Sequence, residues 1–273
     1  MAEFICIHQT DASLLPCVLR KLKGSLSLGP PETAAGVGYF QSDDVLVRKR
    51  PLASQPPHFL ERLAEGVESE AVLLATGSLT RTFKEEATLP IRFKRWLFAV
   101  AGQPEALAPA RDALTAALPQ SLRRAARSES AAEALFFTFL SRLRDAGRLD
   151  DADVDAQTAA RSLAAAVGEA ERAFEQAGAK LPPLAAIVSN GRVLGALRRG
   201  HQLWFATIEG LRECAVHEVG ASSKELDPKV RAHRALRAVV LASGAQPQPP
   251  AGARELAEGE VLAIPRTLQP QKV

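Results

Sequence analysis

The sequence is poor in cysteine: only Cys6, Cys17 and Cys214 occur among its 273 residues, and none of them belongs to a Cys-x-x-Cys pair. This number and spacing exclude a disulfide framework and give no support for a zinc knuckle. The five histidines show no His-Glu-x-x-His motif or other ligand spacing. We therefore expect reduced thiols in a cytoplasmic protein, with no metal and no cofactor.

The sequence also lacks long apolar runs and an excess of one charge. No segment approaches the ~18 uncharged apolar residues of a membrane span, and no basic-then-apolar leader precedes the first strand. The 34 Lys and Arg residues nearly balance the 31 Asp and Glu residues, which argues against a nucleic-acid binder. Local basic clusters, interpreted as solvated faces or strand ends, lie at 92–95, 123–127 and 198–199.

Hydrophobic residues make up 47% of the chain, which is enough for a large core. Their spacing predicts strands first, then helices, then strands again. The early strands are expected at 3–8, 39–41, 45–48, 71–75 and 96–101. Helices are expected at 12–22, from Pro56 to Gly66, and in a block at about 106–177 made of 106–118, 130–146 and 151–177.

The later strands include the strongest hairpin signal, Asn190-Gly191 between two apolar runs. They are expected at 184–189, 192–197, 202–208, 212–219, 238–242 and 261–264. Because strands and helices are grouped rather than alternating as βαβ units, the pattern predicts an α+β layered fold. We expect one domain that spans residues 1–273.

Several short motifs occur in an order that resembles a known family, the class II glutamine amidotransferases. They are a strand that begins at residue 2, Gly36-Val37-Gly38, the strand and turn at 96–103, the helix start at 130–136 and a closing strand at 259–264. The resemblance covers almost the whole chain. It implies the N-terminal-nucleophile hydrolase fold, a four-layer αββα sandwich of two mostly antiparallel sheets.

The resemblance also shows which catalytic parts are missing. The family's nucleophile is a Cys exposed by removal of the initiator Met, and this position is Ala2, which cannot form a thioester. The oxyanion-hole Asn falls at Ala101, whereas the Gly of the same turn is kept as Gly102. The Arg and Asp that hold the substrate's α-amino and α-carboxyl groups fall at Gly77 and Ala131.

The former substrate cleft is then expected to be small and apolar, which favours an apolar ligand or peptide side chain unless the cleft has collapsed. Its expected lining is Ala2, Ala75, Gly77, Val100, Ala101 and Ala131. Arg81, Gly102 and Glu133 are the retained residues near it. Each also has an ordinary interpretation, as a surface Arg, a turn Gly and a helix-start Glu.

We therefore favour a catalytically inactive amidotransferase-like protein, a pseudoenzyme with a binding or regulatory role. We expect an unidentified protein partner or small ligand. A homodimer is also possible for a protein with this role. Membranes and nucleic acids are not expected partners.

The alternative is an active glutamine amidotransferase or other amide hydrolase in which removal of the first five residues exposes Cys6. Cys6 shares a strand face with Ala2 but lies roughly 13 Å further along, inside the sheet. Cys17 is interpreted as helix packing and Cys214 as an ordinary strand residue. A hydroxyl nucleophile at Thr76, Ser78 or Ser130 is left open, because such a site is recognised by geometry.

Overall fold

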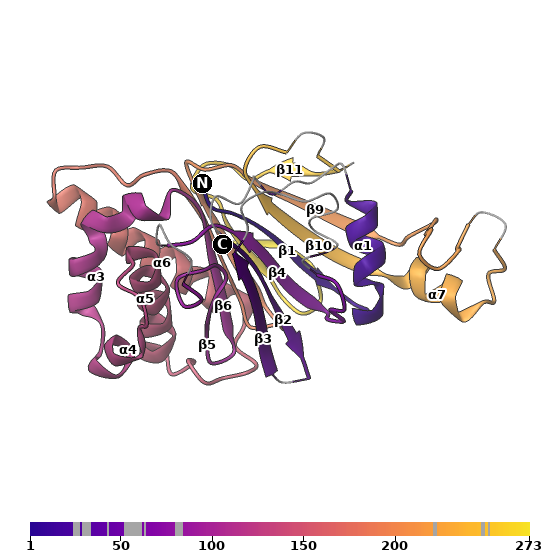
Figure 1. Cartoon of the computed structure of the whole chain (residues 1–273), viewed down its shortest axis with the longest axis horizontal. Helices are drawn as coiled ribbons and strands as arrows, with labels where there is room; N and C mark the ends of the chain where they lie inside the picture. Colours follow the sequence, from indigo (N-terminus) through magenta and orange to yellow (C-terminus); the bar gives the residue numbers. More distant parts are fainter. Residues whose placement is uncertain are drawn as a thin grey trace.

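Two antiparallel β-sheets stack at the centre of the computed structural model, and helices cover their outer faces (Figure 1). The structure describes residues 1–23, 28, 34–42, 44–51, 62, 64–79, 84–220, 223–246, 249–250 and 252–273. Their arrangement is the predicted α+β four-layer sandwich.

The seven-stranded sheet has the order β11-β9-β10-β1-β4-β2-β3. Its strands are β1 (Glu3–Gln9), β2 (Ala34–Gln41), β3 (Asp44–Pro51), β4 (Ala71–Thr76), β9 (Leu203–Glu209), β10 (Arg237–Ser243) and β11 (Arg254–Glu255). β1 lies in the middle, paired with β10 on one side and β4 on the other. Strands from both ends of the chain therefore share this sheet.

The six-stranded sheet has the order β13-β12-β8-β7-β6-β5. Its strands are β5 (Ile91–Phe93), β6 (Trp96–Gly102), β7 (Leu184–Ser189), β8 (Leu194–Arg199), β12 (Val261–Ile264) and β13 (Gln271–Lys272). Every residue of β6 is buried. Because strand side chains alternate, Trp96 and Phe98 face the helices, whereas Ala101 faces the other sheet.

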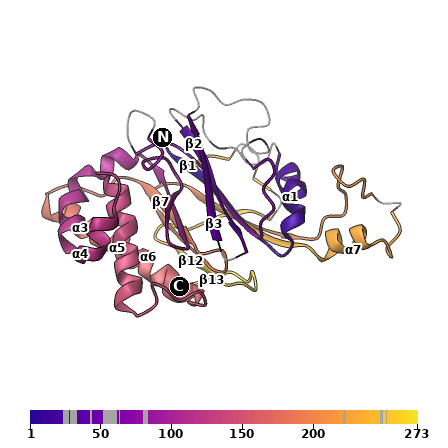
Figure 2. The same ribbon diagram turned by 60° about the horizontal axis from the view of Figure 1, so that its bottom comes forward.

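One helical layer covers the six-stranded sheet and the other is built around α1 (Leu15–Lys21) (Figure 2). The first layer contains α3 (Arg111–Ala117), α4 (Gln120–Ala125), α5 (Ala131–Asp145) and α6 (Ala156–Gln176). In α5, the Phe136 ring stacks on Phe98 at a centroid distance of 5.1 Å. Burying a Phe side chain of this kind contributes about 1.5–3 kcal/mol, so this contact anchors the layer. Among the described residues, no helix is both long enough and apolar enough to span a membrane.

Local capping explains where the helical block departs from its predicted limits. α6 begins at Ala156 rather than at residue 151, because the Asp155 side chain accepts a hydrogen bond from the Thr158 backbone N–H at 2.7 Å. The predicted helix at 106–118 begins as a 3₁₀ segment, Pro104–Ala110, before α3. Pro109 lies inside this segment and has no N–H for α-helical hydrogen bonding.

The strand predicted at 212–219 is wrong. This stretch forms a turn in which Cys214 and Val219 exchange two backbone hydrogen bonds, of 2.8 and 3.0 Å. The helix that follows, α7 (Pro228–Ala235), was not predicted, although Asp227 caps it and Pro228 occupies its first turn. Most of the helix predicted from Pro56, and Asp43 in the predicted hairpin turn, lie outside the described residues.

Candidate functional site

Residue 2 lies where the two sheets meet. The Ala2 backbone N–H donates to the Gly102 carbonyl at 2.8 Å, and the Gly102 N–H donates to the Ala2 carbonyl at 2.9 Å. This antiparallel bridge joins the start of β1 to the last residue of β6. Two positions that the resemblance assigns to catalysis are thus adjacent, and their backbone groups bond to each other.

Glycine is required at two positions of this junction. Gly77 has a φ of +108°, and a Cβ there would lie 2.8 Å from the Ala2 Cβ. Gly102 has a φ of +109°, and a Cβ there would lie 2.5 Å from the Pro183 carbonyl oxygen. Cβ atoms are essentially never found at such distances, so a side chain at either position would strain the backbone and force its neighbours to shift. The Ala2 methyl group occupies the space that a residue 77 side chain would enter.

The other predicted cleft residues are packed in the apolar core around the sheets. Ala75, Val100, Ala101 and Ala131 are between 0% and 4% exposed. Their small side chains therefore do not border open solvent, and ligand binding by them stays a prediction. Arg81 lies outside the described residues.

Cys6 is buried in the central strand of the seven-stranded sheet. Its backbone register pairs it with Leu241 on β10 and Leu73 on β4, and its side chain is 1% exposed. Burial raises the pKa of the Cys6 thiol far above its ordinary value, so it is held protonated. A thiolate nucleophile is therefore not available at Cys6 in this fold.

The hydroxyl groups left open by the sequence have mainly structural environments. The Ser130 hydroxyl caps α5 by accepting from the Glu133 N–H at 3.0 Å. Thr76 is fully buried, and its hydroxyl has no hydrogen-bond partner among the described residues. A separate buried pair, His8 Nε2 and Ser189 Oγ at 2.9 Å, joins β1 to β7 between the sheets. Both side chains are at most 3% exposed, so this pair is closed to substrate.

Glu133, at the start of α5, has a buried carboxylate whose oxygens accept hydrogen bonds from the loop before the helix. It accepts from the Arg127 N–H at 3.1 Å, the Ser128 N–H at 2.6 Å and the Ser128 hydroxyl at 2.7 Å. These donors explain how a carboxylate can be 3% exposed. Glu133 therefore shapes the loop that ends at the cavity described next.

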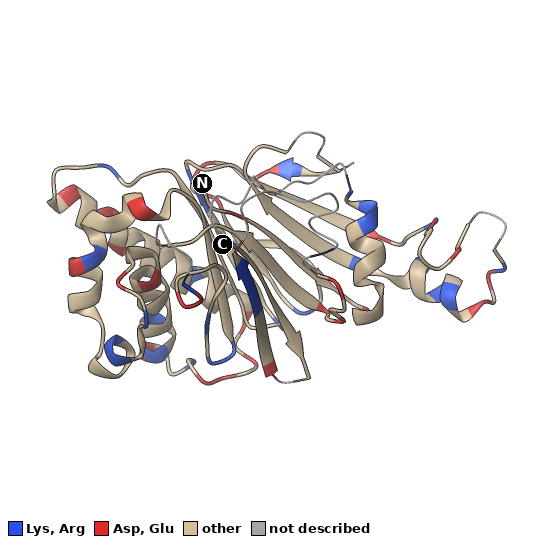
Figure 3. Ribbon diagram, viewed as in Figure 1, with Lys and Arg blue, Asp and Glu red and all other residues tan. Residues whose placement is uncertain are grey.

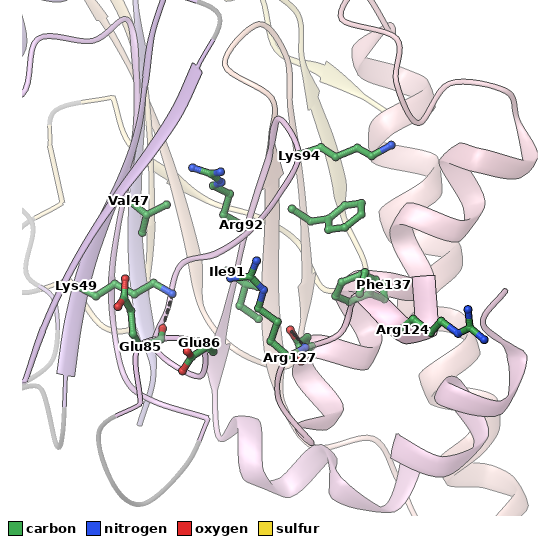
Figure 4. A pocket seen from close by; sticks show the side chains of 13 residues that line it. Val47, Lys49, Glu85, Glu86, Ile91, Arg92, Lys94, Arg124, Arg127 and Phe137 are labelled. Atoms are coloured by element: carbon green, nitrogen blue, oxygen red, sulfur yellow. Dashed lines mark hydrogen bonds between the residues drawn. The ribbon is translucent and has the colours of Figure 1, made fainter. Parts of the chain in front are cut away.

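A cavity of about 700 Å³ lies between β3, β5 and α5 (Figure 4). Its lining combines apolar side chains with five cations and three carboxylates: Val47, Ile91, Phe93, Ala125 and Phe137; Lys49, Arg92, Lys94, Arg124 and Arg127; Glu85, Glu86 and Glu133. Lys49 and Arg127 extend toward it from opposite sides (Figure 4). Part of the lining comes from β3, whose basic residues are drawn blue in Figure 3. This cavity was not predicted from the sequence, although Glu133 and cations of two basic clusters, at 92–95 and 123–127, line it.

Lys49 is the cation whose protonation the cavity changes most clearly. Burial lowers its pKa to about 8, although the carboxylates of Glu85, Glu86 and Glu133 oppose this shift. Its Nζ donates to the Glu85 carbonyl at 2.6 Å. The cavity therefore suits an anionic ligand, because a negative charge near Lys49 would stabilise the charged form of its ammonium group.

Four potential metal ligands that the fold brings together, Cys17, Cys214, His217 and His233, were not predicted from the sequence. Cys214 lies in a turn, so its interpretation as a strand residue was wrong, whereas Cys17 packs in the apolar core as expected. One local signal was present, Cys214-x-x-His217, which has the short spacing of a metal-binding pair. The other two residues are distant in the sequence, so only the fold identifies them.

Two solved structures share this fold. A glutamine aminotransferase class-II domain protein from Silicibacter pomeroyi matches with a TM-score of 0.58 and 17% sequence identity, over 99% of this chain and 98% of that one. A predicted glutamine amidotransferase from Pseudomonas aeruginosa PA01 matches with a TM-score of 0.52 and 15% identity, over 100% of this chain and 96% of that one. No protein-family model and no curated protein matches the sequence. The chain has the class II glutamine amidotransferase-like fold, as the sequence resemblance predicted.

Proposed function

We propose that this chain is a catalytically inactive class II glutamine amidotransferase-like protein that retains a binding role. The observation that carries the proposal is the environment of Ala2. Its methyl group packs on Gly77, and its carbonyl accepts the Gly102 N–H. The residue offers no nucleophile, and the N–H that would stabilise an oxyanion is already bonded.

We assign the binding role to the cavity between β3, β5 and α5. Its expected ligand is a small anion that also has an apolar part. Phe93 and Phe137 form an edge-to-face pair with a centroid distance of 5.2 Å, which supplies apolar contact area. Arg92, Arg124 and Arg127 supply planar donors suited to a carboxylate or phosphate. This assignment replaces the small apolar cleft expected from the sequence. A protein partner, a homodimer and a cytoplasmic location stay predictions.

The second candidate function, amide hydrolysis by a processed Cys6, is less well supported. Processing would remove Phe4 and Ile5, which are both 0% exposed, together with the Ala2–Gly102 bridge. The new terminus would begin in the middle of the central strand of the sheet. The free energy of unfolding of the processed chain would fall, because the burial of two large apolar side chains, Phe4 and Ile5, would be lost.

Mass spectrometry and a glutaminase assay test the loss of activity. We expect the purified chain to keep residues 2–5 and to release no ammonia from glutamine, with or without iodoacetamide. Ammonia release that iodoacetamide abolishes, or a mature chain that begins at Cys6, would contradict the proposal.

A thermal-shift screen with dicarboxylates, aromatic carboxylates and sugar phosphates tests the cavity. We expect at least one of these anions to raise the melting temperature of the wild-type chain and not that of Arg127→Ala. Arg144→Ala is the matched control, because Arg144 is an exposed residue of α5 that does not line the cavity. An equal response of Arg127→Ala and Arg144→Ala would remove the cavity as the binding site.

A further inference from the structure

Four metal-ligating side chains meet on the outer face of the seven-stranded sheet, away from the cavity and the Ala2–Gly102 bridge. Cys17 comes from α1, Cys214 and His217 come from the turn after β9, and His233 comes from α7. Their ligand atoms all lie within 4.8 Å of one another. The two cysteines and His233 are buried and His217 is partly exposed, so the cluster lies just beneath the surface.

The distances match the edges of a metal-centred tetrahedron. The Cys17 Sγ lies 3.1 Å from His217 Nδ1 and 3.6 Å from His233 Nε2. The two ring nitrogens are 3.2 Å apart, and the Cys214 Sγ is 3.9 Å from His217 Nδ1. Zinc bonds of about 2.3 Å to sulfur and about 2.05 Å to nitrogen imply edges of roughly 3.5 Å for S–N and roughly 3.3 Å for N–N. These four of the six edges agree with the expected values to within about 0.4 Å, and the other two are no longer than 4.8 Å.

The second coordination sphere of His233 is also in place. Its Nδ1 lies 2.7 Å from the Lys229 carbonyl, which can only accept a hydrogen bond, so Nδ1 carries the proton. The lone pair of Nε2 then points into the cluster. Metal-bound histidines characteristically donate their second ring N–H to such a carbonyl, which sets the tautomer and the ring orientation.

We propose that Cys17, Cys214, His217 and His233 bind a structural Zn²⁺ ion. Two thiolates and two neutral imidazoles balance the charge of a divalent cation, and this tetrahedral sulfur–nitrogen set is characteristic of zinc. Binding displaces the two thiol protons to solvent and involves no redox step. Because protein atoms occupy all four positions, no position is left for a reactive water.

The ion would hold α7 and the turn after β9 against α1. α7 lies at the end of the molecule beyond α1 (Figures 1 and 2). Only Val230 and His233 are buried in this helix, so apolar packing contributes little to its position. A metal shared by α1, the turn and α7 supplies the missing constraint, as in small zinc-stabilised domains.

Metal analysis of the purified full-length chain tests the proposal. We expect one equivalent of Zn²⁺ per chain after zinc loading and desalting, and loss of this zinc in His217→Ala. His217 is the ligand to change because it is partly exposed and its removal disturbs packing least. His201→Ala is the matched control, because His201 is equally half-buried and lies outside the cluster. Wild-type chain without bound zinc, or His217→Ala with undiminished zinc, would overturn the proposal.

Cobalt substitution of the wild-type chain gives a readout that does not depend on how any variant folds. Wild-type chain loaded with Co²⁺ should show the intense visible d–d bands of tetrahedral cobalt and a thiolate-to-metal charge-transfer band in the near ultraviolet. Cys214→Ser should weaken the charge-transfer band, because one of two thiolates is lost. Octahedral-type weak bands, or no bands, in the wild-type chain would mean a metal-free hydrogen-bonded cluster and would overturn the proposal.

Discussion

Ala2 and Gly102 exchange two backbone hydrogen bonds, of 2.8 and 2.9 Å, and so join the start of β1 in the seven-stranded sheet to the end of β6 in the six-stranded sheet. The bond from the Gly102 N–H matters most for function. In a working amidotransferase site, as the resemblance implies, this N–H faces the oxyanion. Here it is bonded to the carbonyl of Ala2, the residue that the resemblance places at the position of the nucleophile.

Restoring the nucleophile alone should therefore not restore activity. We expect Ala2→Cys to release no more ammonia from glutamine than Ala2→Ser. The side chain of Ala101 donates no hydrogen bond, and loss of one oxyanion donor already costs about 10²–10³ in rate. Gly77 and Ala131 also cannot hold the substrate's charged groups. Glutaminase activity of Ala2→Cys that thiol alkylation removes would show that the proposed loss of function depends on residue 2 alone.

Gly77→Ala should destabilise the fold through its contact with Ala2. A methyl group at position 77 would lie 2.8 Å from the Ala2 Cβ, at a φ of +108°. We expect a loss of about 2–4 kcal/mol in the free energy of unfolding, from strain and overpacking together. Urea denaturation measures this change.

Two further variants separate strain from overpacking. Gly147 also has a positive φ, +70°, and a Cβ there would meet nothing within 4 Å. Gly147→Ala should therefore cost only about 1–2 kcal/mol. In the Ala2→Gly background, the cost of Gly77→Ala should fall but stay above that value, because the close contact with the Cα of residue 2 at 3.0 Å and the φ of +108° remain. No rescue by Ala2→Gly would contradict the packing described for these two residues.

His8 should make stability depend on pH. Burial lowers the pKa of His8 to about 4, whereas in the unfolded chain it titrates near its ordinary value of 6.5. Between these values the unfolded state binds a proton that the native state does not. Neutral His8 therefore adds on the order of 3 kcal/mol to the free energy of unfolding above about pH 6.5, relative to the value near about pH 4. This addition is lost progressively as the pH falls between those two values.

Urea denaturation of wild type and His8→Asn between about pH 7 and about pH 4.5 checks this expectation. Asn does not titrate in this window, so the pH dependence of the variant should be shallower. Native-state protonation would place a charge in the buried space beside the His8 Nε2–Ser189 Oγ contact of 2.9 Å. Parallel pH profiles for the two chains would exclude His8 as the source.

Glu133→Ala should destabilise the loop before α5. The carboxylate accepts the N–H groups of Arg127 and Ser128, and its removal leaves donors without their acceptor. We expect a loss of about 2–3 kcal/mol, measured by urea denaturation. Glu129→Ala is the control from the same loop, because the Glu129 carboxylate is 90% exposed and, among the described residues, is seen only in a 3.9 Å ion pair with Arg111. If both variants lowered the free energy of unfolding by a similar amount, the buried hydrogen bonds of Glu133 would not be the source of the loss.

The order of strands and helices was predictable from the sequence, because periodic apolar spacing is a local signal. The strands β1, β4, β6, β7 and β10 lie within one or two residues of their expected positions. The resemblance likewise identified the fold, whereas the assignment of Ala2 to the position of a catalytic Cys stays a prediction. The resemblance was carried by the order of short motifs along the chain.

Long-range packing decided the rest. The contact of Ala2 with Gly77 depends on strand register between residues 75 apart, which no local pattern specifies. The cavity cations come from β3, β5 and the turn after it, α4 and the loop before α5. Those in the clusters at 92–95 and 123–127 were interpreted as solvated faces or strand ends when each cluster was considered alone. Cys17 and His233 are 216 residues apart, yet their Sγ and Nε2 atoms lie 3.6 Å apart. A turn mistaken for a strand supplies Cys214 and His217. The fold brings the four side chains together because α1, this turn and α7 pack on one face of the seven-stranded sheet.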